Sequence, residues 1–244
     1  MTSRRMLLLS SSRDSAGVYL LHSSAAIERT LGSAVTRVLF IPYAGVTISH
    51  ADYAAKAAIP FATLGCSMDS IGDAADPVAA VAAAQAIVIG GGNTFRLLES
   101  LQINKLIDAI RARVHAGVPY IGWSAGAVVT APTIATTNDM PIVWPQSLRA
   151  LDLIPFQINA HYTDFQQPNH QGETRAERLE EYIAVNRGMR VLGLREGCSL
   201  SIVDDEISLN GDGTAPVFAY GMPRSDYIAS DDISFLIRAE SHAL

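Results

Sequence analysis

One serine sits in a setting that could make it a nucleophile, within Gly122-Trp123-Ser124-Ala125-Gly126. The apolar residues 118–121 before it predict a buried strand, and the small residues 125–130 after it predict a helix that Pro132 limits. A sharp strand-to-helix turn pushes such a hydroxyl above the sheet edge, and the helix N-terminus points free N–H groups toward it. The spacing therefore predicts a nucleophile elbow at Ser124, with acyl transfer as its chemistry.

A serine hydroxyl needs a base to take its proton, and the base needs an acid to orient it. Among the six histidines, His161 is the best candidate because it follows the apolar residues 153–158 at a predicted strand end, where sites gather in α/β sheets. The other five lie in polar or helical surroundings typical of solvated residues. Glu196 follows the predicted strand 190–194 in the same way. The order serine, histidine, acid differs from the order in α/β-hydrolases, which argues against that class.

A glycine turn supplies a third part of the predicted site. Residues 86–89 predict a buried strand that runs into Gly90-Gly91-Gly92-Asn93-Thr94. Phosphate binding is the alternative for such a turn, but the lysine of a P-loop and the spacing of a dinucleotide fingerprint are both missing. The backbone N–H groups of Gly92 and Ala125 are therefore predicted to stabilise a developing oxyanion.

Short apolar runs alternate with helical patterns through most of the chain. The runs are residues 6–9, 38–41, 86–89, 118–121 and 191–194, and the helical patterns are residues 49–64, 76–84, 94–101 and 103–116. This alternation predicts an α/β fold with a mostly parallel, doubly wound sheet covered by helices on both faces. Residues 200–203, 207–209 and 217–220 predict antiparallel hairpins that extend one sheet edge. Residues 1–244 are expected to form a single catalytic domain.

Composition narrows the class of protein. The 18 basic and 24 acidic residues give a formal charge of −6 without a basic stripe, so neither nucleic acid nor a membrane surface is an expected partner. No run approaches the roughly 20 apolar residues that span a bilayer. Two distant cysteines, Cys66 and Cys198, have no metal-ligand spacing and indicate a reducing compartment, so a cytoplasmic location is expected. No metal or other cofactor is expected.

Several motifs occur together in one order along the chain. They are Gly90-Gly91-Gly92-Asn93-Thr94, Gly122-Trp123-Ser124-Ala125-Gly126, Thr136-Thr137-Asn138-Asp139-Met140-Pro141, Gln157-Ile158-Asn159-Ala160-His161 and Gly172-Glu173-Thr174-Arg175. With these motifs, the chain strongly resembles the peptidase E family of α-aspartyl dipeptidases over nearly its whole length. The resemblance implies a fold similar to a class I glutamine-amidotransferase domain, in which serine replaces the cysteine nucleophile.

The resemblance also implies an activity, the cleavage of dipeptides that carry an N-terminal aspartate. In this scheme Ser124 attacks the peptide carbonyl, His161 acts as base and then as acid, and Glu196 orients His161. Asp139 is the rival carboxylate for that last role.

Recognition of an aspartyl substrate needs a cation for its side chain and an acid for its free amine. Arg175 matches the family motif and its planar guanidinium can bind a carboxylate through two hydrogen bonds. Either Asp139 or Glu173 can hold the amine, and Asn93 is placed with the substrate-binding residues.

Two positions depart from the family pattern. Ala160 and Arg195 stand where a proline often precedes the histidine and the glutamate. Neither change removes a reacting group, but Arg195 adds positive charge beside Glu196.

Two other functions compete with the dipeptidase. One is a cyanophycinase-like hydrolase of aspartyl polymers, and the other is a non-catalytic sensor of small peptides. The expected partner is a small Asp-Xaa peptide, and self-association into a homo-oligomer stays open.

Overall fold

The computed structural model describes residues 3–14, 16–169 and 171–238. His170 and His242, two of the histidines expected to be solvated, lie outside these ranges. None of the described helices is long and apolar enough to cross a membrane. Cys66 and Cys198 are both buried free thiols. The single domain over residues 1–244 stays a prediction.

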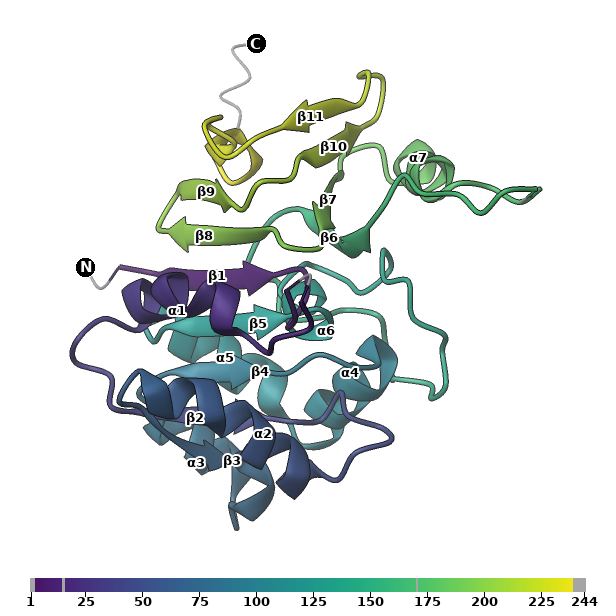
Figure 1. Cartoon of the computed structure of the whole chain (residues 1–244). Helices are drawn as coiled ribbons and strands as arrows, with labels where there is room; N and C mark the ends of the chain where they lie inside the picture. The colour runs from purple at the N-terminus through teal and green to yellow at the C-terminus, as the bar shows by residue number, and fades with distance from the viewer. Residues whose placement is uncertain (1–2, 15, 170, 239–244) are drawn as a thin grey trace.

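A seven-stranded sheet forms the centre of the larger layer, in the order β3-β2-β4-β5-β1-β8-β9 (Figure 1). Neighbours among the first five of these strands run parallel, whereas β8 is antiparallel to β1 and β9 to β8. The predicted parallel sheet with a hairpin at its edge is thus confirmed for this part of the chain. The strands are β1 (Arg5–Leu9), β2 (Arg37–Ile41), β3 (Ser67–Ser70), β4 (Ile87–Ile89), β5 (Tyr120–Trp123), β8 (Ser199–Val203) and β9 (Glu206–Asn210).

Helices cover both faces of this sheet because alternate strand residues point to opposite sides. Leu7 and Leu9 pack with the helices α1 (Ser24–Leu31) and α2 (His50–Thr63). Met6 and Leu8 lie in a second cluster on the other face. That cluster includes residues of α3 (Pro77–Ala83), α4 (Thr94–Ile103) and α5 (Leu106–His115). Short 3₁₀ helices span Leu21–Ser23, Ile71–Asp73 and Ser234–Leu236.

A second, four-stranded sheet lies above the first, in the order β11-β10-β7-β6. Its strands are β6 (Gln157–Tyr162), β7 (Arg190–Arg195), β10 (Ala215–Ala219) and β11 (Ser225–Tyr227), and α7 (Arg175–Val185) packs on it through Leu179 and Ile183. The expectation that residues 191–194 belong to the main parallel sheet, with residues 217–220 extending it, is wrong. Apolar periodicity identifies a strand but not its neighbour, and β7 pairs instead with β6 and β10.

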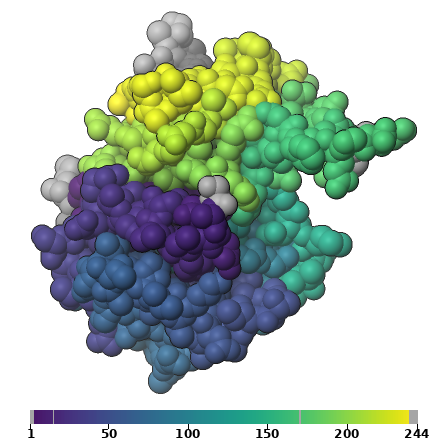
Figure 2. Space-filling view, viewed as in Figure 1, coloured from purple at the N-terminus to yellow at the C-terminus, as the bar shows by residue number. Residues whose placement is uncertain are grey.

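The two sheets meet where β1 ends. Ser10, the residue after β1, is fully buried, and its hydroxyl donates a hydrogen bond of 2.7 Å to the carbonyl of Leu194 in β7. Figure 2 shows the N-terminal segment, in purple, packed between the blue layer below and the yellow-green layer above. This junction places the C-terminal ends of β6 and β7 over the end of β5, where the candidate site lies.

Candidate active site

Ser124 lies in the predicted elbow, between β5 and the short helix α6 (Ala125–Val128). Its φ of 52° is in the left-handed region, a strained conformation that concentrates at functional sites. The turn is tight because Gly126 packs on β4, where an added Cβ would lie 2.2 Å from the carbonyl oxygen of Ile89. The Ser124 N–H is fixed by a 3.0 Å hydrogen bond to the carbonyl of Leu9. The side chain remains partly exposed above the sheet.

His161 and Glu196 meet Ser124 from the second sheet. His161 Nε2 lies 2.9 Å from Ser124 Oγ, and His161 Nδ1 lies 2.8 Å from Glu196 Oε1. A β-bulge in β6 between Ala160 and Tyr162 turns the imidazole toward the elbow, and His161 has a φ of 54°. Glu196 follows directly after the end of β7. The three side chains therefore form a continuous hydrogen-bonded chain from an exposed carboxylate to the serine hydroxyl.

Ser10 holds the bulged backbone of His161 and was missed by sequence reasoning. Its Oγ accepts a 2.9 Å hydrogen bond from the His161 N–H while its own hydroxyl proton goes to Leu194. Both bonds cross between the two sheets. The only signal in the sequence is a serine directly after an apolar strand, which many surface loops share.

The glycine turn and the start of α6 each present one backbone donor near the serine. Gly92 has a φ of 139°, and a Cβ there would lie 2.1 Å from the carbonyl oxygen of Ala44, so a larger residue cannot replace it. The Tyr53 hydroxyl donates to the Gly91 carbonyl at 2.9 Å and fixes the turn. Within the described part of the chain, neither the Gly92 N–H nor the Ala125 N–H has a hydrogen-bond acceptor. Both remain available to a ligand.

Asp139 forms no hydrogen bond with His161, whose ring nitrogens face Glu196 and Ser124. Its Oδ2 accepts hydrogen bonds from the Thr94 N–H at 2.7 Å and from the hydroxyls of Thr94 and Thr137. It nevertheless lines a small cavity beside the nucleophile together with Ser124 and His161.

Asn93 caps helix α4 and supports the loop that carries Asp139. Its side-chain oxygen accepts the Arg96 N–H at 3.0 Å, and its side-chain amide donates to the Met140 carbonyl at 2.9 Å. The substrate contact expected of Asn93 stays a prediction, since both ends of its amide have protein partners.

Arg175 lies at the start of α7, in a larger cavity that we call the arginine cavity, with a volume of ≈ 710 Å³. Its Nη1 donates a 2.6 Å hydrogen bond to the carbonyl of His161, so the guanidinium lies directly behind the histidine backbone. Burial lowers its pKa from the ordinary value because desolvation disfavours the charged form, and the nearby positive charge of Arg178 lowers it further. Asp139 and the exposed Glu173 line the same cavity. The arrangement can receive an anion.

Arg195, the departure from the family pattern, does not leave free charge beside Glu196. Its guanidinium binds Asp164, which follows β6, and Arg224 donates to the same carboxylate at 2.7 Å. This cluster ties the ends of β6 and β7, the strands that carry His161 and Glu196.

Replacing Asp164 with asparagine is expected to reduce stability in a pH-dependent way. The hydrogen bond from Arg224, helped by Arg195, holds the pKa of Asp164 well below its usual range. The ionised carboxylate therefore stabilises the fold above its unfolded pKa of about 3.9, and this stabilisation is lost as pH falls through the lower, folded pKa. Because the side chain is 44% exposed, the loss at pH 7 is at most about 1 kcal/mol.

Urea unfolding of wild type and Asp164→Asn at pH 7 and pH 3.5 measures this difference. The difference in unfolding free energy between wild type and Asp164→Asn should be smaller at pH 3.5 than at pH 7. The exposed Asp73→Asn is the control and should show no such gap, and a gap that widens on acidification would contradict the assignment.

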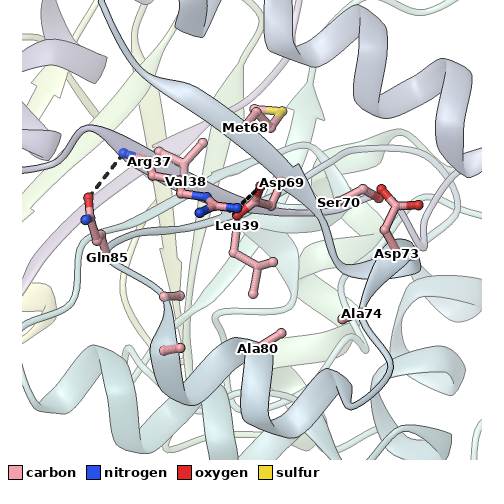
Figure 3. A pocket seen from close by; sticks show the side chains of 12 residues that line it. Arg37, Val38, Leu39, Met68, Asp69, Ser70, Asp73, Ala74, Ala80 and Gln85 are labelled. Atoms are coloured by element: carbon pink, nitrogen blue, oxygen red, sulfur yellow. Dashed lines mark hydrogen bonds and ion pairs between the residues drawn. The ribbon is translucent and has the colours of Figure 1, made fainter.

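Another cavity lies away from Ser124, beside the edge strand β3 (Figure 3). Three of the polar residues that line it are already paired, since Arg37 forms an ion pair with Asp69 and the Arg37 N–H donates to Gln85 Oε1 at 3.1 Å. None of the candidate catalytic residues lines it. Across the described ranges, no group of three or more His, Cys, Asp or Glu side chains is placed to hold a metal ion.

Comparison with known proteins defines the class to which this fold and site belong. The model of peptidase family S51 matches residues 6–210, and the chain therefore belongs to that family of peptide hydrolases. Peptidase E of a Nostoc species is 44% identical over 239 residues, covering 98% of this chain and 99% of that protein. Peptidase E of Shewanella amazonensis is 42% identical over 233 residues, covering 96% and 99%. The resemblance to peptidase E that the motifs predicted is confirmed.

A solved structure shows the same fold. The crystal structure of a peptidase from an acI-B1 actinobacterium superimposes with a TM-score of 0.71 at 20% identity, covering 96% of this chain and 97% of that one. The α/β architecture with a mostly parallel central sheet is thus shared. The further likeness to glutamine-amidotransferase domains stays a prediction.

Proposed function

We propose that this protein is a serine dipeptidase that hydrolyses dipeptides with an N-terminal aspartate. The observation that carries the proposal is the chain from Glu196 through His161 to Ser124 at hydrogen-bond distances, beside a cavity lined by the half-buried Arg175. Membership of family S51 and relatives named peptidase E support it.

The reaction begins when Ser124 Oγ attacks the carbonyl carbon of the aspartyl residue. His161 Nε2 takes the hydroxyl proton, and Glu196 stabilises the imidazolium that forms. The N–H groups of Gly92 and Ala125 bind the negative oxygen of the tetrahedral intermediate. His161 then gives its proton to the leaving nitrogen, and the carbon–nitrogen bond breaks. Water, activated by the same histidine, hydrolyses the acyl-enzyme and restores the serine.

Selectivity for aspartate rests on charges in the arginine cavity. Arg175 uses one N–H on the His161 carbonyl, and its remaining N–H groups bind the substrate side-chain carboxylate. We assign the substrate amine to Asp139 rather than Glu173, since Asp139 also lines the small cavity beside Ser124 whereas Glu173 does not. The hydrogen bonds that Asp139 accepts all reach Oδ2, and Oδ1 stays available for an ammonium group.

Arg175→Gln is expected to lower kcat/KM for Asp-Leu by about 100-fold, because the substrate carboxylate loses its half-buried charged partner. Hydrolysis of Asp-Leu, Asn-Leu, Glu-Leu, Ala-Leu and N-acetyl-Asp-Leu by wild type and variant measures the effect. Wild type should cleave Asp-Leu and reject the others. The variant should lose its preference for Asp-Leu over Asn-Leu.

Arg187→Gln, exposed just beyond the same helix and outside the arginine cavity, is the control. It should change the Asp-Leu rate by less than about threefold, as surface charges do. If Arg175 acted only through the His161 backbone, Asp-Leu and Asn-Leu would lose rate equally. Efficient hydrolysis of an aspartyl polymer with arginine side groups, without cleavage of Asp-Leu, would favour the cyanophycinase-like alternative.

A further inference from the structure

Another cavity reaches Ser124 without contacting Arg175, and we call it the lysine cavity. It has a volume of ≈ 490 Å³ and is lined by Gly92, Ser124, His161, Arg13, Tyr19 and Lys56, among others. Asp139, Glu173 and Arg175 do not line it. Ser124 and His161 are thus shared between this cavity and the small cavity beside Asp139. A substrate bound across the nucleophile would place one residue on each side.

The lysine cavity contains a cation without an acidic partner. Lys56, half-buried on α2, forms no ion pair with a described residue, and its Nζ lies 4.8 Å from the ring centroid of Tyr19. The two acids of the cavity are engaged elsewhere. Asp14 Oδ1 accepts the N–H groups of Ala16 and Val18, and Glu196 binds His161.

Arg13 is the other cation of the lysine cavity, and its guanidinium already has a partner in the protein. Arg13 is exposed, and its Nη1 donates a 2.7 Å hydrogen bond to the carbonyl of Gly17 within its own loop. Lys56, by contrast, is carried by a helix whose first turn is capped by Ser49 and is steadied by the Tyr19 ring. Lys56 is therefore the rigidly placed positive charge on this side of the nucleophile.

Resting on the proposed function, we infer that the lysine cavity holds the residue released by the reaction, and that Lys56 binds the α-carboxylate of that residue. In a dipeptide this carboxylate is one carbon away from the nitrogen that leaves, so the nitrogen can face His161 while the carboxylate faces Lys56. In a longer peptide the same position carries an uncharged amide. Lys56 is thus a specificity-determining residue that makes the enzyme select dipeptides over longer peptides.

The test compares Asp-Leu with its C-terminal amide, Asp-Leu-NH₂. The amide lacks the negative charge of the α-carboxylate that Lys56 is inferred to bind. Wild type should prefer Asp-Leu by about tenfold in kcat/KM, the size expected for one partly exposed charge pair. Lys56→Met, which keeps an aliphatic side chain but removes the ammonium group that lies over Tyr19, should lose about tenfold on Asp-Leu, mostly through KM, and less than about twofold on the amide. Lys56→Arg should retain most of the preference.

Arg29→Gln removes an equal charge from the exposed face of α1 and should leave both substrates unchanged. Equal losses on the two substrates in Lys56→Met, or none on either, would overturn the inference while leaving the proposed function intact. A changed preference for Asp-Leu over Asn-Leu would overturn it too, because it would place Lys56 on the aspartyl side. Failure of wild type to hydrolyse either peptide would overturn the proposed function and this inference together.

Discussion

Replacing Ser124 with alanine is expected to lower kcat/KM for Asp-Leu by about 10⁵-fold, because no other group at the elbow can form the acyl-enzyme. The fold should persist, since the turn is set by Gly126 and by the Ser124 backbone bond to Leu9. Initial rates with Asp-Leu measure the loss, and thermal unfolding reports on the fold. The exposed Ser230→Ala is the control and should keep full activity.

The same variant separates an enzyme from a sensor. Asp-Leu should still raise the melting temperature of Ser124→Ala, since the charged groups that bind the substrate remain. Retention of most of the hydrolytic rate would refute the nucleophile assignment. A wild type that binds Asp-Leu without hydrolysing it would favour the sensor.

Glu196→Gln is expected to lower kcat for Asp-Leu by about 10³-fold. Glutamine fills the same space, but it offers the imidazolium no negative charge and can stabilise the wrong tautomer of His161. The loss is smaller than for a fully buried acid, since the Glu196 side chain is 70% exposed and water can take its place in part. Steady-state rates at saturating Asp-Leu measure the effect.

Asp139→Asn is the matched comparison, because Asp139 was the rival acid and lies near the site without a hydrogen bond to His161. It should raise KM for Asp-Leu, as expected for an amine-binding residue, and leave kcat much less affected than Glu196→Gln does. The reverse pattern would exchange the roles of the two acids.

Much of the first sheet could be predicted from the sequence because its parallel strands are buried on both faces. Such strands appear as continuous apolar runs, as in residues 38–41 and 86–89, and the helices between them carry clear caps. The elbow was equally visible, since the glycines at 122 and 126 flank a serine at the point where a strand pattern gives way to a helix pattern. Helix α7 likewise has a local signal at its start, because Thr174 and Glu177 form a capping box.

The rest was hidden because it depends on which elements meet in space. Strand β3 (Ser67–Ser70) is polar and lies at the sheet edge, so it lacks the apolar run that identified its neighbours. The division into two sheets leaves no local signal in residues 191–194. Ser10 and Lys56 are placed at the site by tertiary contacts alone, and neither lies in a recognisable catalytic or binding motif.

The place of β1 between β5 and β8 has a consequence for synthesis of the chain. This first strand, Arg5–Leu9, is almost entirely apolar, and one of its edges is paired only by residues 199–203. While the ribosome adds the residues between them, that edge stays open, and open apolar edges invite pairing with other chains. The nascent protein therefore passes through a long interval in which this apolar edge is open to pairing with other chains.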